Sequence, residues 1–150
     1  MDELTLQRLG LQLPPCPQPI GAYRPVVIAG RSAYLSGQLA KTAQGNLITG
    51  RVGEDLTLAQ GREAARAAAL NVVSVIHHLI GFEKLEQFLR VVGYVQTAPG
   101  FYDVPKVIDA ASDLFKEIFS DRGIHARTSV GMFNLPLNSA VELEVTLQLR

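Results

Sequence analysis

The chain has 150 residues, of which 47% are hydrophobic and 19% charged, and its 14 basic and 14 acidic residues cancel. This composition excludes a disordered chain, and the balanced charge gives no sign of a nucleic-acid-binding surface. No apolar run approaches the roughly 18 residues of a membrane helix, and the single cysteine, Cys16, cannot close an internal disulfide. We therefore expect a soluble cytoplasmic protein without a membrane or nucleic-acid partner, folded as one domain over residues 1–150.

The N-terminal part of the chain divides into a helix and an extended segment. A short helix is predicted over residues 2–10, with Asp2 as its N-cap and Gly10 as its terminator. Prolines at positions 14, 15, 17 and 19 follow, and proline disfavours both helices and central strands. Residues 1–18 are therefore interpreted as an N-terminal helix and a proline-rich extension of the domain.

Two strands and a long helix are predicted next. Runs of β-forming residues predict strands over 25–29 and 33–39, with a turn between them. Apolar side chains then recur every three or four residues over 57–80, which predicts an amphipathic helix that ends at Gly81. On its polar face we place Asn71 and Ser74, together with Glu63, Arg66 and His78.

The second half of the chain predicts a strand, a helix and two more strands. The strand covers 88–97, and the helix opens at Asp103 and Pro105 with an apolar stripe that ends at Phe119. Asp109 of this helix is expected to face water. The last two strands, over 126–133 and 140–149, are expected to pair as a hairpin, and the second alternates strictly between apolar and polar residues.

These elements give the order β-β-α-β-α-β-β, which is typical of an α+β fold. Two amphipathic helices can cover only one face of a mixed sheet, so the other face stays in water or is buried in an oligomer. We expect Arg127 and Ser129 on this uncovered face. Thr128, Val130 and Met132, which alternate with them, would then turn toward the helices.

The usual catalytic and cofactor motifs are missing from the sequence. His77 and His78 are adjacent on a helix and point about 100° apart, so they cannot chelate a metal as a pair. No metal-ligand spacing and no glycine-rich nucleotide loop is present, so we expect neither a metal nor an organic cofactor. Cys16 lies among prolines rather than at a helix N-terminus, which favours an inert thiol.

The most informative residues are Arg127 and Glu142, on the two last strands. An arginine within a strand of small and apolar residues is costly unless it is paired or used. Its planar fork suits a substrate carboxylate, and Glu142 has the chemistry to hold a water molecule as an acid or base. The alternative is a structural ion pair between Arg127 and Glu142, and the residues alone leave both interpretations open.

The C-terminal third resembles the signature of the RidA/YjgF family of reactive-intermediate deaminases, once labelled endoribonuclease L-PSP or translation inhibitors. The matching pattern is Arg127-Thr128-Ser129-Val130, then Leu135-Pro136, then Val141-Glu142-Leu143-Glu144. Upstream, Pro19-Ile20-Gly21-Ala22-Tyr23 and Leu35-Ser36-Gly37-Gln38 are similar to the family's tyrosine-bearing segment and its Ser-Gly-Gln strand. The resemblance runs from about Pro19 to Leu149.

The resemblance implies a chorismate-mutase-like fold and a homotrimer with clefts between its subunits. It implies that Arg127 anchors the carboxylate of a small 2-imino acid and that Glu142 positions the water that hydrolyses the C=N bond. Tyr23 and Ser36 would line the cleft, and backbone groups near Ser129 and Gly131 would bind the polar end of the ligand. No cofactor is implied, because an imine is already electrophilic.

Two departures from the deaminase pattern indicate a divergent branch and leave three functions open. Ser129 stands where well-studied members carry cysteine, and residues 104–119 lack their asparagine. The first function is imine or enamine hydrolysis, which the retained Arg127 and Glu142 favour. The second is a trimer that binds a small carboxylate metabolite without turnover. The third is RNA cleavage and translation inhibition, against which the neutral charge speaks.

Overall fold

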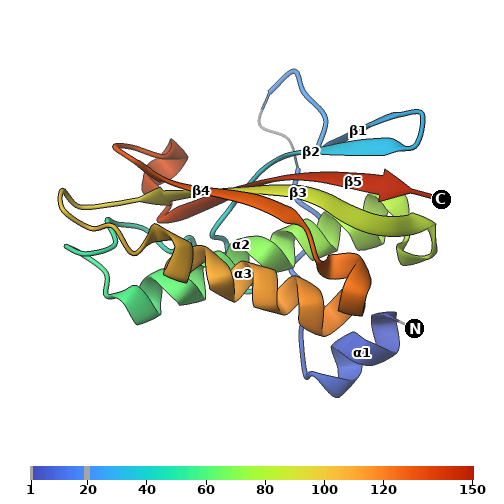
Figure 1. Cartoon of the computed structure of the whole chain (residues 1–150), viewed down its shortest axis with the longest axis horizontal. Coiled ribbons are helices and arrows are strands. Elements are labelled where there is room, and N and C mark those ends of the chain that lie inside the picture. The colour runs from blue at the N-terminus through green and yellow to red at the C-terminus, as the bar shows by residue number, and fades with distance from the viewer. Residues whose placement is uncertain (1, 19–20) are drawn as a thin grey trace.

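A five-stranded sheet and two long helices laid across one of its faces form the body of the structure (Figure 1). The computed structural model describes residues 2–18 and 21–150. The strands are β1 (Val26–Ala29), β2 (Ser32–Leu39), β3 (Leu85–Gln96), β4 (Ala126–Met132) and β5 (Val141–Leu149). The helices are α1 (Asp2–Arg8), α2 (Leu58–Val75) and α3 (Val104–Phe119), with short turns at Ile76–Ile80, Phe82–Lys84, Ser120–Gly123 and Pro136–Asn138.

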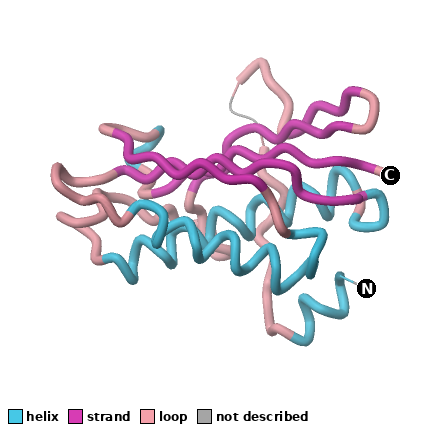
Figure 2. The backbone as a smooth tube through the Cα atoms, viewed as in Figure 1, coloured by secondary structure: helices cyan, strands magenta, loops and turns pink. Residues whose placement is uncertain are grey.

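The predicted α+β fold and the order of its strands and main helices are confirmed. Helices and strands form two separate layers, with both long helices on the same side of the sheet (Figure 2). The N-terminal helix α1 packs against α3 and buries Leu6, so it adds to the helix layer and leaves the other face of the sheet uncovered (Figure 1). Within the described residues, no helix is both long and apolar enough to cross a membrane.

The predicted terminal hairpin is wrong. The strands lie in the order β1-β2-β5-β3-β4, so β3 separates β4 from β5. β4 pairs with β3 in parallel, whereas β5 pairs antiparallel with both β2 and β3. A parallel neighbour requires a crossover, which α3 supplies between β3 and β4. The strictly alternating strand therefore becomes the centre of the sheet, where its apolar face is fully covered by helices.

The polar face expected for α2 is also partly wrong. Thr57 caps this helix through a capping box with Gln60, but Asn71 and Ser74 are buried rather than exposed. The side-chain amide of Asn71 donates to the carbonyl of Lys41 at 2.6 Å, and the hydroxyl of Ser74 donates to the carbonyl of Pro14 at 2.7 Å. The proline-rich extension therefore supplies the partner of Ser74, and the segment after β2 supplies that of Asn71, neither of which the periodicity of the helix could reveal.

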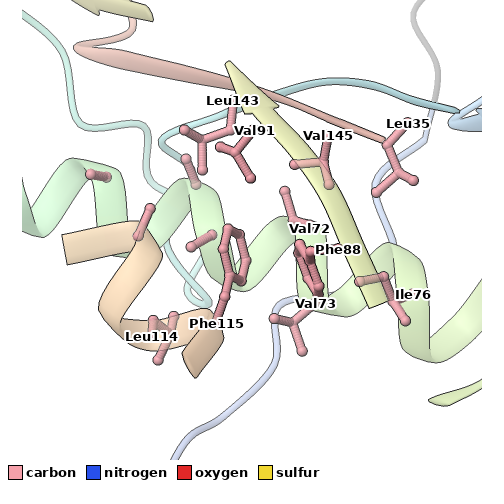
Figure 3. Packing of buried hydrophobic residues seen from close by; sticks show 14 of the residues in the cluster. Leu35, Val72, Val73, Ile76, Phe88, Val91, Leu114, Phe115, Leu143 and Val145 are labelled. Atoms are coloured by element: carbon pink, nitrogen blue, oxygen red, sulfur yellow. The ribbon is translucent and has the colours of Figure 1, made fainter. Parts of the chain in front are cut away.

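The hydrophobic core lies between the helix layer and the sheet (Figure 3). Leu143 and Val145 of β5 point toward Val72 and Phe115 of the helices (Figure 3), and all of these side chains are buried. Gly93 of β3 lies beneath α3, where an added Cβ would be 2.5 Å from Cγ1 of Ile108. The absence of a side chain at this position therefore allows α3 to lie directly on the sheet.

Candidate functional site

Three of the predicted site residues follow one another along β4, at the edge of the sheet. Arg127, Ser129 and Gly131 occupy alternate positions and so share one face of the strand. This is the face that carries the helices, because Arg127 reaches α3 and an added Cβ on Gly131 would lie 3.7 Å from Cγ2 of Val104. The expectation that Arg127 and Ser129 point to the uncovered face is therefore wrong, and Val130 instead is exposed there.

Arg127 is held by side chains of α3. Its Nη1 donates to Oδ1 of Asp109 at 2.8 Å and to the hydroxyl of Ser112 at 3.1 Å, and its Nη2 lies 3.4 Å from the carbonyl oxygen of Pro105. Asp109 was expected to face water, but it turns toward the arginine and forms an ion pair with it. The guanidinium is thus fixed in place, with its charge balanced within the same chain.

His125 extends this network, although the sequence showed it only as an isolated loop residue. Its Nδ1 lies 2.7 Å from the carbonyl oxygen of Gly123, so that nitrogen carries the proton, and its Nε2 lies 3.0 Å from the Ser112 hydroxyl. Burial lowers the pKa of His125, and the nearby positive charge of Arg127 lowers it further. The neutral histidine therefore accepts from Ser112, whose oxygen accepts from Arg127.

A second group of predicted residues gathers around Glu142 on β5. Glu142 pairs with Leu39 of β2, and an added Cβ on Gly37 would collide with the Glu142 carboxylate. The register shifts between Leu35 and Gln38, so Ser36 and Gly37 form an irregular step beside Glu142. The Ser-Gly-Gln motif therefore brings the backbone close to this carboxylate, and a larger residue than Gly37 would require the Glu142 side chain to move.

Ser36 connects the segment before β1 to this group of residues through two hydrogen bonds. Its hydroxyl donates to the carbonyl of Arg24 at 2.6 Å, and its amide donates to the carbonyl of Pro25 at 2.9 Å. Tyr23, which is 53% exposed, directly precedes Arg24. The structure therefore brings Ser36 and Glu142 close together, with the backbone of Arg24, the residue after Tyr23, bonded to Ser36. Pro19 and Ile20 of the same predicted motif lie outside the described residues.

The charged neighbour that acts on the pKa of Glu142 is a second carboxylate, Glu144. Burial raises the pKa of the Glu142 carboxyl, and Glu144, two residues along the same strand, raises it further. Tyr94 of β3 lies directly opposite Glu142 and donates its hydroxyl to Glu144. Its pKa is raised by burial and by both carboxylates, in spite of a lowering effect from Arg90. Tyr94 and Glu144 were missed by the sequence analysis as possible members of this site.

The two groups lie on opposite faces of the sheet. Arg127 aligns with Val91 and Val145, whose side chains are buried under the helices. Glu142 aligns with Tyr94, which lies three residues after Val91 on β3. Because side chains alternate along a strand, Tyr94 and Glu142 point to the opposite face from Val91 and Arg127. The structural ion pair between Arg127 and Glu142 does not form, because Arg127 pairs with Asp109 instead. Within one chain, no ligand can touch both side chains.

The remaining candidate residues are partnered or inert. Burial raises the pKa of the Cys16 thiol, which keeps it in its unreactive form. His77 lies 3.6 Å from Glu3, and the ring of His78 contacts the backbone of Ser74 at 2.8 Å. In the described part of the chain, no three His, Cys, Asp or Glu side chains are placed to hold a metal ion together.

The fold and the order of these motifs agree with a known family. The family model described as "YjgF/chorismate_mutase-like, putative endoribonuclease" matches residues 3–148. This match spans nearly the whole chain, including both groups of site residues. The protein therefore belongs to the YjgF/chorismate-mutase-like family, as the sequence motifs predicted.

Individual relatives match most of the length of the chain. Protein TCP17 of Trypanosoma cruzi is 37% identical over 147 residues, which cover 97% of this chain and 92% of the relative. The 2-iminobutanoate/2-iminopropanoate deaminase of Dermatophagoides farinae is 30% identical over 135 residues, covering 89% and 91% of the two chains. The crystal structure of a "putative endoribonuclease" from Shewanella oneidensis has a TM-score of 0.94 at 32% identity, with 99% of each chain covered.

Proposed function

We propose that the protein hydrolyses reactive 2-imino acids to 2-keto acids and ammonia, in clefts between the subunits of a homotrimer. The observation that carries this proposal is the placement of Arg127 and Glu142 on opposite faces of one sheet. A site that uses both must take one from each of two chains. The similarity to a protein named as a 2-imino acid deaminase supports the choice of substrate.

The uncovered face of the sheet supports assembly. Val27 and Tyr34 pair across β1 and β2 and are each about half exposed there, and Val130 is exposed on β4. Exposed apolar side chains on a sheet face are stabilised when another surface covers them. We propose that the Arg127 edge of a second copy lies against this face, beside Tyr23, Ser36 and Glu142 of its neighbour.

In the proposed reaction, Arg127 and Glu142 have separate roles. Arg127 binds the carboxylate of the imine, while Ser129 and Gly131 lie beside it along β4. Glu142 accepts a proton from water as the water oxygen bonds to the C=N carbon of the protonated imine, and then passes this proton to the amino nitrogen of the adduct. The C–N bond breaks and ammonia leaves, while the former water oxygen gives its remaining proton to Glu142 and becomes the carbonyl of a 2-keto acid. Glu142 finally releases this proton to solvent. No external oxidant or reductant is needed.

An assay with an imine formed in place tests this function. An amino-acid oxidase converts 2-aminobutanoate to 2-iminobutanoate, and semicarbazide traps whatever imine persists. The protein at micromolar concentration should lower the semicarbazone signal and raise the initial rate of ammonia release. An unchanged signal would refute the deaminase function.

A second candidate, binding without turnover, is favoured by one specific observation. Residues 104–119 of α3 carry no asparagine, the residue that the resemblance to the deaminases leads one to expect there. This function predicts that a small carboxylate ligand binds with measurable heat while the semicarbazone signal stays the same. Calorimetry beside the trapping assay therefore separates the two candidates.

A further inference from the structure

The ion pair between Asp109 and Arg127 lies at the surface, where a ligand can reach it. The side chains of Arg127 and Asp109 are 23% and 48% exposed. The Ser112 hydroxyl accepts from the guanidinium and contacts the ring of His125, which is itself fixed by the carbonyl of Gly123. The pair is therefore a prearranged part of the surface rather than an element of the core.

Arg127 retains donors for a further partner. The described contacts involve Nη1 and, at 3.4 Å, Nη2, and none of them involves Nε. Because a guanidinium carries five N–H donors in a planar fork, one of its edges remains available for a carboxylate. Two residues along β4, the buried hydroxyl oxygen of Ser129 has no hydrogen-bond partner among the described residues. This unpartnered oxygen indicates a place for a polar ligand group beside Arg127.

A ligand carboxylate on this edge would share one cation with Asp109. The two carboxylates would then lie within a few ångströms of each other and repel. A positive nitrogen next to the ligand carboxylate would offset this repulsion, because it would cancel the negative charge that the ligand brings. The charge of Asp109 therefore disfavours plain anions much more than it disfavours zwitterions.

We propose that Asp109 is a specificity-determining residue that makes this site select carboxylates bearing an adjacent cationic nitrogen. The inference rests on the proposed role of Arg127 as the carboxylate anchor. A protonated 2-imino acid carries such a nitrogen, whereas the 2-keto acid formed from it does not. The site thus prefers its substrate to its product, and product release follows from the loss of the positive charge.

The test compares two ligands with the same carbon skeleton, 2-aminobutanoate and 2-oxobutanoate, by calorimetry on the full chain. The parent should bind the zwitterion more tightly than the keto acid. Asp109→Asn should tighten keto-acid binding about three- to tenfold, as expected for removal of a partly screened like charge, and so reduce or reverse the preference. Asp109→Glu, which restores the charge, should restore the preference.

Asp113→Asn is the matched control, because it removes the same charge from α3 at a position that pairs with Arg62 instead. It should leave the ratio of the two affinities unchanged. If Asp109→Asn remains folded and the ratio equals that of the parent, the specificity role is wrong. If Arg127→Ala binds both ligands as well as the parent does, the anchor itself is wrong, and the proposed function fails separately.

Discussion

The two faces of the sheet differ in how their charged side chains are partnered. On the helix side, Arg127 is balanced by Asp109 and oriented through Ser112. On the uncovered side, Glu142 and Glu144 stand together beside Tyr94, and burial and mutual repulsion raise the pKa of Glu142. The cationic half of the proposed site is therefore complete within one chain, whereas Glu142 in the anionic half forms no ion pair among the described residues.

Val130→Glu should have the largest effect, because the proposed assembly joins the Arg127 edge of one chain to the uncovered sheet face of another. Val130 is 37% exposed on the uncovered face, and a buried unpaired carboxylate there would be costly. We expect dissociation at micromolar concentration by light scattering, with loss of all turnover. Ala59→Glu adds the same charge on the exposed surface of α2 and should leave both unchanged. A parent chain that is monomeric would contradict the shared site.

Glu142→Gln should separate chemistry from binding and stability. If the carboxylate activates water, turnover should fall about 100-fold or more, while calorimetry shows ligand binding close to that of the parent. Because the pKa of Glu142 is higher in the folded chain than in the unfolded chain, its stabilising contribution exists at low pH and is lost as pH rises through the folded pKa. The substitution should therefore raise the melting temperature at neutral pH.

Glu86→Gln is the control, because Glu86 lies on β3 but pairs at the surface with Arg150. It should leave turnover unchanged. A lower melting temperature for Glu142→Gln, with binding and turnover reduced together, would show instead that Glu142 is a structural residue.

Glu144→Gln should have the smallest effect, and it tests how strongly the charge of Glu144 acts on the pKa of Glu142. Turnover that needs the ionised Glu142 is lost as pH falls through the pKa of that carboxyl. Burial is the larger cause of its raised pKa, and the charge of Glu144 is the second. Removing that charge should therefore move the acidic limb of the pH–rate profile to lower pH by a fraction of a unit. An acidic limb that does not move would exclude this coupling.

Periodicity predicted which residues share a face but not which face the helices cover. On β4, the rule that apolar side chains point inward placed Val130 under the helices and Arg127 outside, and the structure shows the reverse. The rule failed because both faces of this sheet carry apolar side chains. The pairing of the strands could not be predicted either, because the alternation along β5 is the same whether it pairs with β4 or lies between β2 and β3.

The parts that could be predicted depend on local signals. The apolar stripe of α3, including Ile108 and Phe115, is buried as its spacing indicated, and Thr57 caps α2 where the helix was expected to begin. The contacts of Asp109 and His125 join residues 13 to 18 positions apart through Ser112 and Arg127. They depend on how α3 lies across β4, which no local pattern contains.

The height of α3 above the sheet is determined by Gly93, which has no functional group. An alanine there would meet the side chain of Ile108, and unless that side chain turned aside, the helix would rise and move Asp109 and Ser112 away from β4 together. The strength of an ion pair falls with the separation of its charges. A change of one methyl group at position 93 on β3 would thus alter the ligand preference of the site at Arg127. Relatives with different residues at this position would then differ in selectivity while keeping every polar residue of the site.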